Sequence, residues 1–564
     1  MRGTRSDPAT SGDQARPGQA RPGPARPGPA RPGQDGAAGA GRPRAWWRPD
    51  WLVVVVPAAA ELIVGGYRIG VPSLWRDEAA TISGSQRPVA AILAMMGNED
   101  AVHGPYYLLM HPVIAVGGIS ATTLRLPSLV AMCLAVALTA ALGRRLARDS
   151  GLPGAPAVGL VAGLTLAAVP LTTRYAQEAR PYALATLCAV LATYLLVRAV
   201  DRPRPRWWTL YAAALLLTGM FNLFAAALAV AHGASLAWAS RTPAGAAAQS
   251  QTTAGQVTAA TVRCWLAACA AAAVLLAPVA YLSAGQSAQL NWVRRPDPST
   301  VATLLRDFSG AGVLIPVVAA LALLGCLAGP SIRRGGGLTL GTVTLPWLVL
   351  PPAILVAVSF AHPVYVERYV LFCLPALAVL TSAGLVWLAA ATRRGLAGRG
   401  LAARGLGGRR ADALAVVPSA ALAVVIVVAV AGPQREIRQP DARADDLRAV
   451  ASVIAARERP GDAVLYLPRD AALVGVAYPA PFRKLRDIGL GTSPVASATL
   501  RGRAAPPGVV AARLRGVRRV WTVQWAEPLS RATAAPASLT RLLTSMRVVG
   551  RWHIQSVVLR LYRF

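Results

Sequence analysis

The chain has 564 residues, of which 54% are hydrophobic and only 15% are charged. Alanine, leucine and valine occur in runs of about twenty residues, the length that spans a bilayer as a helix. These runs lack the alternation of polar and apolar residues that a membrane β-barrel needs, so the barrel is excluded. A soluble chain would not need such runs, and the composition therefore predicts an α-helical polytopic membrane protein.

The net charge of +33 comes from 58 basic and 25 acidic residues. A basic chain can bind nucleic acid, but here the arginines are scattered through the loops between apolar runs, and Lys484 is the single lysine. We see no module that interleaves basic and aromatic residues, so no nucleic-acid partner is predicted. The six cysteines fall in or beside apolar runs, which is typical of buried hydrophobic residues rather than of disulfides or a metal site.

Three regions follow one another along the chain. Residues 1–45 are rich in Arg, Pro, Gly and Ala, which predicts a disordered basic tail on the cytoplasmic side. Residues 46–432 form the membrane domain, with about eleven spans, the N terminus inside and a first outer loop at 71–123. The predicted spans are 51–70, 124–143, 156–173, 181–200, a split pair within 208–240, 263–283, 311–329, 342–361, 368–392 and 413–432.

The apolar segment from Pro105 to Gly118 has about fourteen residues, too few for a span. A span here would invert every later loop and place the basic loops outside. We therefore predict a helix that lies on the outer membrane surface.

Apolar runs stop after Gly432, and residues 433–564 mix helix and strand patterns. A helix opened by Asp445 and Asp446, strands at 463–467 and 519–525, and a terminal strand at 555–564 predict a small extracytoplasmic α/β domain.

Two adjacent carboxylates, Asp77 and Glu78, follow the first predicted span. Neighbouring side chains of a helix point about 100° apart, so only one carboxylate can aim into a site between helices, and we favour Asp77. The alternative is structural: Asp77 caps a surface helix and Glu78 complements its dipole.

Further polar clusters fall in the predicted outer loops. The candidate binding residues in them are His103, Tyr106, Glu178, Arg180, Tyr182, Arg368 and Tyr369. Arginine is disfavoured in outer loops, and its planar donors suit a phosphate, so the clusters indicate one convergent site for an anionic ligand. Aromatic-belt residues, interfacial histidine and salt-bridged helix ends remain the alternative explanations.

The order of these motifs resembles that of the GT-C superfamily of polytopic glycosyltransferases. It is most similar to the protein O-mannosyltransferase and lipid A aminoarabinose transferase group, in its actinobacterial branch. The motifs are Trp75-Arg76-Asp77-Glu78-Ala79, His103-Gly104-Pro105-Tyr106-Tyr107, Leu124-Arg125-Leu126-Pro127-Ser128, Gln177-Glu178-Ala179-Arg180-Pro181-Tyr182 and Glu367-Arg368-Tyr369. Gly104 departs from the family, which commonly has a second proline there.

The resemblance implies that a sugar, mannose or a related one, moves from a polyprenyl-phosphate donor to an acceptor outside the plasma membrane, with inversion. It implies that Asp77 is catalytic with Glu78 beside it, and that the other candidates bind the donor. The acceptor would be a protein, a lipoglycan or a wall polysaccharide of the cell envelope. The residues suit this chemistry, because a carboxylate can deprotonate a hydroxyl while arginines stabilise a departing phosphate. No cofactor is predicted, although one carboxylate-bound divalent cation stays open.

Two other functions stay open. A transporter or flippase of a lipid-linked sugar would carry polar groups near the membrane midplane, and Glu61, halfway along the first span, favours it. A non-enzymatic membrane protein could bind envelope polymer through its C-terminal domain. The collection of ionisable residues in outer loops favours the transferase.

Overall fold

The computed structural model describes residues 50–241, 256–328, 337–398, 408–526 and 537–564. The predicted basic tail of residues 1–45 lies outside these ranges. The helices are α1 Leu52–Gly66, α2 Arg76–Ser85, α3 Val89–Met96, α4 Gly104–Gly117, α5 Ala121–Asp149, α6 Ala155–Ala168, α7 Pro170–Ala176, α8 Tyr182–Asp201, α9 Pro205–Phe221, α10 Leu228–Arg241, α11 Ala259–Gly285, α12 Pro298–Ser309, α13 Ile315–Leu327, α14 Leu340–Ala361, α15 Leu374–Gly398, α16 Gly408–Glu436, α17 Leu447–Ala455, α18 Leu473–Ala477, α19 Pro479–Phe482, α20 Pro507–Leu514 and α21 Ala537–Arg541. The strands are β1 Ala463–Leu467, β2 Arg486–Asp487, β3 Leu490–Thr492, β4 Arg503–Ala504, β5 Arg519–Trp525, β6 Arg547–Ile554 and β7 Val557–Arg563.

Long apolar helices dominate the first two thirds of the chain and confirm a multi-pass membrane protein. By length and composition, six described helices can cross a membrane, or eight if each bent pair is one span. The bent pairs are α6 with α7, at 67°, and α12 with α13, at 84°. Pro170 begins α7 and breaks the first pair, because proline cannot continue the preceding helix.

The predicted number of about eleven spans exceeds this count by three. The difference lies in α1 and α9, which have 15 and 17 residues, and in α16. The first two are short for a full bilayer crossing. The predicted split pair within 208–240 is present, since α9 ends before Asn222 and an apolar helical stretch follows it over Leu223–Arg241.

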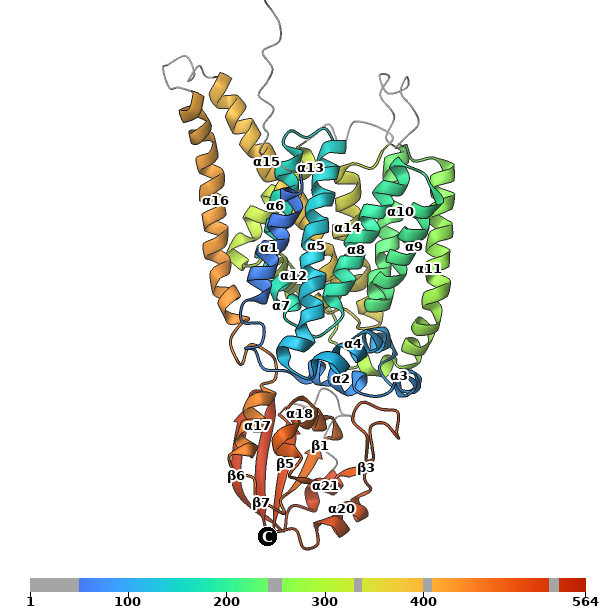
Figure 1. The fold of residues 1–564 in the computed structure, drawn as a ribbon, viewed down its shortest axis with the longest axis vertical. Coiled ribbons are helices and arrows are strands. Elements are labelled where there is room, and N and C mark those ends of the chain that lie inside the picture. The colour runs from blue at the N-terminus through green and yellow to red at the C-terminus, as the bar shows by residue number, and fades with distance from the viewer. Residues whose placement is uncertain (1–49, 242–255, 329–336, 399–407, 527–536) are drawn as a thin grey trace, which may run out of the picture. The chain divides into compact units, whose positions relative to one another are not determined.

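Three short helices, α2, α3 and α4, lie across one end of the long helices (Figure 1). Helix α4 covers the apolar segment that is too short to span, and it runs crosswise to its long neighbours. This direction suits the predicted surface helix rather than a further span.

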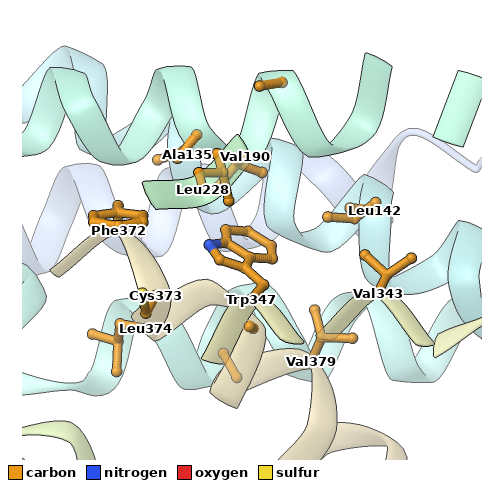
Figure 2. Close-up of a cluster of buried hydrophobic side chains, with 14 of the residues drawn as sticks. Ala135, Leu142, Val190, Leu228, Val343, Trp347, Phe372, Cys373, Leu374 and Val379 are labelled. Atoms are coloured by element: carbon orange, nitrogen blue, oxygen red, sulfur yellow. The ribbon is translucent and has the colours of Figure 1, made fainter. Parts of the chain in front are cut away.

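The long helices pack around a large apolar core in which Trp347 of α14 is fully buried (Figure 2). Its neighbours come from four other parts of the chain, with Ala135 on α5, Val190 on α8, Leu228 on α10 and Phe372 just before α15. Packing between helices distant in sequence fixes the helix ends that carry the polar motifs.

The C-terminal domain is a small α/β unit, as predicted. Its sheet has the order β2-β1-β5-β7-β6, with β1 parallel to β2 and β5, and β7 antiparallel to β5 and β6. Strands β1 and β5 have the predicted bounds, and Asp446 caps α17 by accepting a hydrogen bond from the Ala449 amide. Strands β2 and β6 were not predicted.

Charged contacts join this domain to α2 and to the chain around α3. Arg76 donates to both carboxylate oxygens of Asp445, at 2.8 and 2.6 Å, and its guanidinium lies 4.3 Å from the centre of the Trp525 ring. Glu99 pairs with Arg501 and accepts from the Leu500 amide at 2.8 Å. The domain therefore packs directly against the motif that contains Asp77.

Candidate active site

A cavity of about 660 Å³ lies between α2, the segments that precede α8 and α15, and the C-terminal domain. Six of the predicted site residues line it, namely Asp77, His103, Arg180, Tyr182, Arg368 and Tyr369. These residues come from four separate stretches of sequence. The fold thus brings the predicted outer clusters together in one place.

Asp77 lies in the first turn of α2, which begins directly after the extended residue Trp75. Its side chain is 22% exposed, and its carboxylate oxygen lies 3.9 Å from a guanidinium nitrogen of Arg368. Arg180 donates to the Asp77 main-chain carbonyl at 3.4 Å. The Asp77 carboxylate therefore lies at the cavity beside Arg368, while Arg180 contacts the main chain of the same residue.

Glu78 points away from the cavity into a fully buried ion pair. Arg125 donates to its two oxygens at 2.8 and 2.7 Å, and the Ala179 amide donates at 3.0 Å. Burial alone would raise the pKa of Glu78, but the Arg125 pair outweighs it and the pKa is lowered. The surroundings of Glu78 therefore suit a positioning residue rather than one that contacts the substrate.

Arg125 also anchors the loop before α2, donating to the main-chain carbonyls of Ile69, Pro72 and Ser73. The prediction of site residues missed it, although it stands inside one of the motifs that carried the resemblance. The signal available was an arginine in an otherwise apolar span, where a charge needs a partner.

His103 connects a buried carboxylate to Arg180. Its Nδ1 lies 2.6 Å from Asp100 and its Nε2 lies 2.6 Å from a guanidinium nitrogen of Arg180. Since Arg180 can only donate, Nε2 accepts and Nδ1 carries the proton. Burial and the Arg180 charge lower the pKa of His103, which keeps the ring neutral. Tyr107 also donates to Asp100.

Asp100 was not predicted as a site residue, although it lines the cavity. Burial would raise its pKa, but His103, Arg180 and Tyr107 outweigh burial and lower it. Asp100 is thus the charged end of a hydrogen-bonded chain that orients Arg180.

Arg368 is surrounded by aromatic rings. Its guanidinium carbon lies 5.9 Å from the centre of Tyr182, 5.7 Å from Tyr369 and 5.3 Å from Trp292. Asn222, at the break between α9 and the next helical stretch, donates to the Tyr369 carbonyl at 2.9 Å. Aromatic walls exclude water, so the Arg368 charge acts at reduced screening.

The structure places Tyr106 and Glu178 behind the cavity rather than in it. Tyr106 is fully buried, and Glu178 is 1% exposed. Arg174 lies 3.1 Å from the Glu178 carboxylate, and burial raises the pKa of Glu178. Neither residue lines the cavity, and their contact with the donor stays a prediction.

Within the described ranges, no group of three or more His, Cys, Asp or Glu residues could hold a metal ion. The cavity instead offers Arg180 and Arg368 as fixed cations. Glu61, in α1, is fully buried and lies outside the cavity lining.

Comparison with known proteins gives a match to one family model over part of the chain, and a shared fold with solved structures. Residues 103–281 match the model of the dolichyl-phosphate-mannose-protein mannosyltransferase family. No curated protein sequence matches the chain. ArnT from Cupriavidus metallidurans is 14% identical and covers 90% of this chain and 97% of its own, with a TM-score of 0.52 in the apo state and 0.53 bound to undecaprenyl phosphate.

A second solved structure has the same fold. The oligosaccharyltransferase AglB from Archaeoglobus fulgidus, in complex with an inhibitory peptide and a dolichol-phosphate, is 11% identical, with a TM-score of 0.50. The match covers 91% of this chain and 74% of AglB. At these identities the likeness to solved structures establishes the fold alone. The family match adds a similarity in sequence, over residues 103–281. Taken together, the family match and the shared fold indicate a glycosyltransferase that resembles those of the GT-C superfamily, the protein O-mannosyltransferases and ArnT among them.

Proposed function

We propose that this glycosyltransferase moves a sugar, mannose or a related one, from a polyprenyl-phosphate donor to an acceptor hydroxyl outside the membrane. The observation that carries the proposal is the cavity lined by Asp77, Arg180 and Arg368, in which the Arg368 guanidinium lies 3.9 Å from the Asp77 carboxylate and Arg180 donates to the Asp77 carbonyl. The undecaprenyl phosphate bound to ArnT and the dolichol-phosphate in the AglB complex support a lipid-phosphate donor.

The reaction needs one base and one anion site. The acceptor oxygen attacks the anomeric carbon while its proton passes to the Asp77 carboxylate. The bond between that carbon and the phosphate oxygen breaks, and the polyprenyl phosphate leaves. Arg180 and Arg368 stabilise the negative charge that the leaving phosphate gains. Attack from the face opposite the leaving group inverts the anomeric centre.

One cavity carboxylate suffices for this chemistry. A lipid phosphate is already a good leaving group, so no general acid has to protonate it, unlike the leaving oxygen of an ordinary glycoside. This requirement agrees with Asp77 facing the cavity while Glu78 is bound to Arg125. In this mechanism His103 and Asp100 are positioning residues, because they hold Arg180.

The test is the Asp77→Asn substitution, assayed with a labelled polyprenyl-phosphate sugar in purified, reconstituted protein. Transfer should fall by about 100-fold or more, the contribution of a positioned general base. The matched control is Asp441→Asn, an exposed carboxylate outside the cavity lining, which should transfer at the wild-type rate. Wild-type transfer by the Asp77→Asn variant would contradict the proposal.

A further inference from the structure

The sheet of the C-terminal domain has a topological switch point between β1 and β5. These two strands are parallel neighbours, and the chain leaving β1 goes to β2 on one side while the chain leaving β5 goes to β6 and β7 on the other. In open α/β sheets, the crevice at the carboxyl ends of two such strands is where ligands bind.

This crevice opens into the cavity that contains Asp77. Asp470, in the turn that follows β1, and Trp525, the last residue of β5, both line the cavity. The guanidinium of Arg76, next to Asp77 in sequence, lies over the Trp525 ring at 4.3 Å. The ligand-binding edge of the domain and the catalytic carboxylate therefore share one space.

The wall at this edge is polar and partly open. Arg501 lies 2.5 Å from Asp470 and also pairs with Glu99 of the helical part. The side chains of Arg501, Asp470 and Glu99 remain 26%, 25% and 13% exposed. Each carboxylate can accept further hydrogen bonds, and the guanidinium has further donors, so this trio suits a ligand rich in hydroxyl groups.

An extended peptide suits this wall less well. Peptides commonly bind α/β and β domains by adding a strand to an open sheet edge. The strand that ends at the cavity is β5, and it is already paired with β1 on one side and with β7 on the other. No unpaired edge of this strand is left for an acceptor peptide.

We propose that the C-terminal domain supplies the acceptor subsite, and that this subsite takes a saccharide through Asp470, Arg501 and Glu99. The inference rests on the transferase function proposed above. Arg180 and Arg368, on the helical part, take the donor phosphate, and the saccharide enters from the domain side with one hydroxyl at Asp77. The reaction balance is unchanged, since the acceptor still loses one proton to Asp77.

The experiment compares two substitutions of the same type in the full-length reconstituted protein. Asp470→Asn removes a carboxylate at the cavity, whereas Asp487→Asn removes one that pairs with Arg469 at 2.6 Å and does not line that cavity. The probes are a methyl glycoside, a disaccharide methyl glycoside and a threonine-containing hexapeptide. Transfer to each probe and hydrolysis of the donor by water are measured.

Asp470→Asn should raise KM for the glycoside about tenfold, the loss expected for a hydrogen bond to a charged group. Asp487→Asn should leave both that KM and the hydrolysis of the donor unchanged. Glu99→Gln, on the helical side of the cavity, should raise the same KM.

Equal KM values for the two aspartate variants, or transfer to the hexapeptide alone, would overturn the inference. Failure of the transferase function itself has a different signature. In that case the Asp77→Asn variant would match the wild type both in transfer and in hydrolysis of the donor.

Discussion

Asp77 and Glu78 are neighbours with opposite surroundings, one at the edge of an open cavity and the other in a buried ion pair. The helical angle between adjacent residues already predicts that only one can aim into the site. The partner of Glu78 could not be predicted in the same way. Arg125 lies in a different helix, and only the packing of α5 against α2 and its loop brings the two charges together.

The buried pair makes a prediction about stability. Glu78→Gln should lower the free energy of unfolding by about 3–5 kcal/mol, because it leaves the Arg125 charge buried without its counter-ion. Thermal unfolding in detergent measures the loss, and Glu436→Gln on an exposed carboxylate is the control. The lowered pKa of Glu78 means that its stabilisation is present above its ordinary pKa of 4.5 and is lost as pH falls through the lowered value. A wild-type melting temperature for Glu78→Gln would disprove the pair's importance.

Neutral His103 makes a prediction about pH. Its lowered pKa means that the folded ring stays neutral below pH 6.5, where the unfolded ring binds a proton, so stability also declines as pH falls there. Protonation at Nε2 would remove the acceptor of the Arg180 hydrogen bond and place two cations together. Donor KM should therefore rise about tenfold as pH falls through the lowered pKa.

The measurement is donor KM against pH, because the sugar phosphodiester gains no proton in this range. His103→Asn cannot titrate, so its donor KM should be raised at all pH values and should lack the acid limb. An acid limb that persists in this variant would assign the titration to another group.

At the scale of helices and strands, sequence periodicity predicted the features that local sequence determines, such as the bounds of single strands. The strands Ala463–Leu467 and Arg519–Trp525 have the predicted bounds, because each is a short run rich in valine, leucine and aromatic residues between turns. The parallel order β2-β1-β5 depends on crossovers that no local pattern records. For the same reason the contacts of Arg501 with Asp470 and Glu99 could not be predicted.

Close packing of α13 against α15 makes a prediction at this scale. A Cβ atom on Gly384 would lie 2.0 Å from the Leu321 carbonyl oxygen, so the two backbones approach as only glycine allows. Gly384→Ala should cost about 1–3 kcal/mol of stability, because one helix must move away. The control is Gly341→Ala in α14, where the new Cβ meets no atom within 4 Å. Equal melting temperatures of the two variants would show that α13 and α15 can separate without cost.

For the whole molecule, three long helices share one direction. Helices α5, α8 and α15 begin at the end that carries the cavity motifs and finish near basic residues such as Arg145, Arg198 and Arg393. Arg145 pairs with Asp201, which brings the far ends of α5 and α8 together. Basic residues gather on the cytoplasmic side of membrane proteins, so the cavity end should face outward. Arg180 and Arg368 depart from this rule, and the lipid phosphate would explain why.

Topology reporters test this orientation in cells. A phosphatase that is active only outside the cytoplasm should be active when fused after Phe564 and inactive when inserted in the turn 150–154 that follows α5. The helix directions place the two positions on opposite sides of the membrane. Helix α5 leads away from the cavity, whereas the C-terminal domain packs against the cavity. Reporter activity at 150–154 with none after Phe564 would show the opposite orientation, with donor and acceptor on the cytoplasmic side.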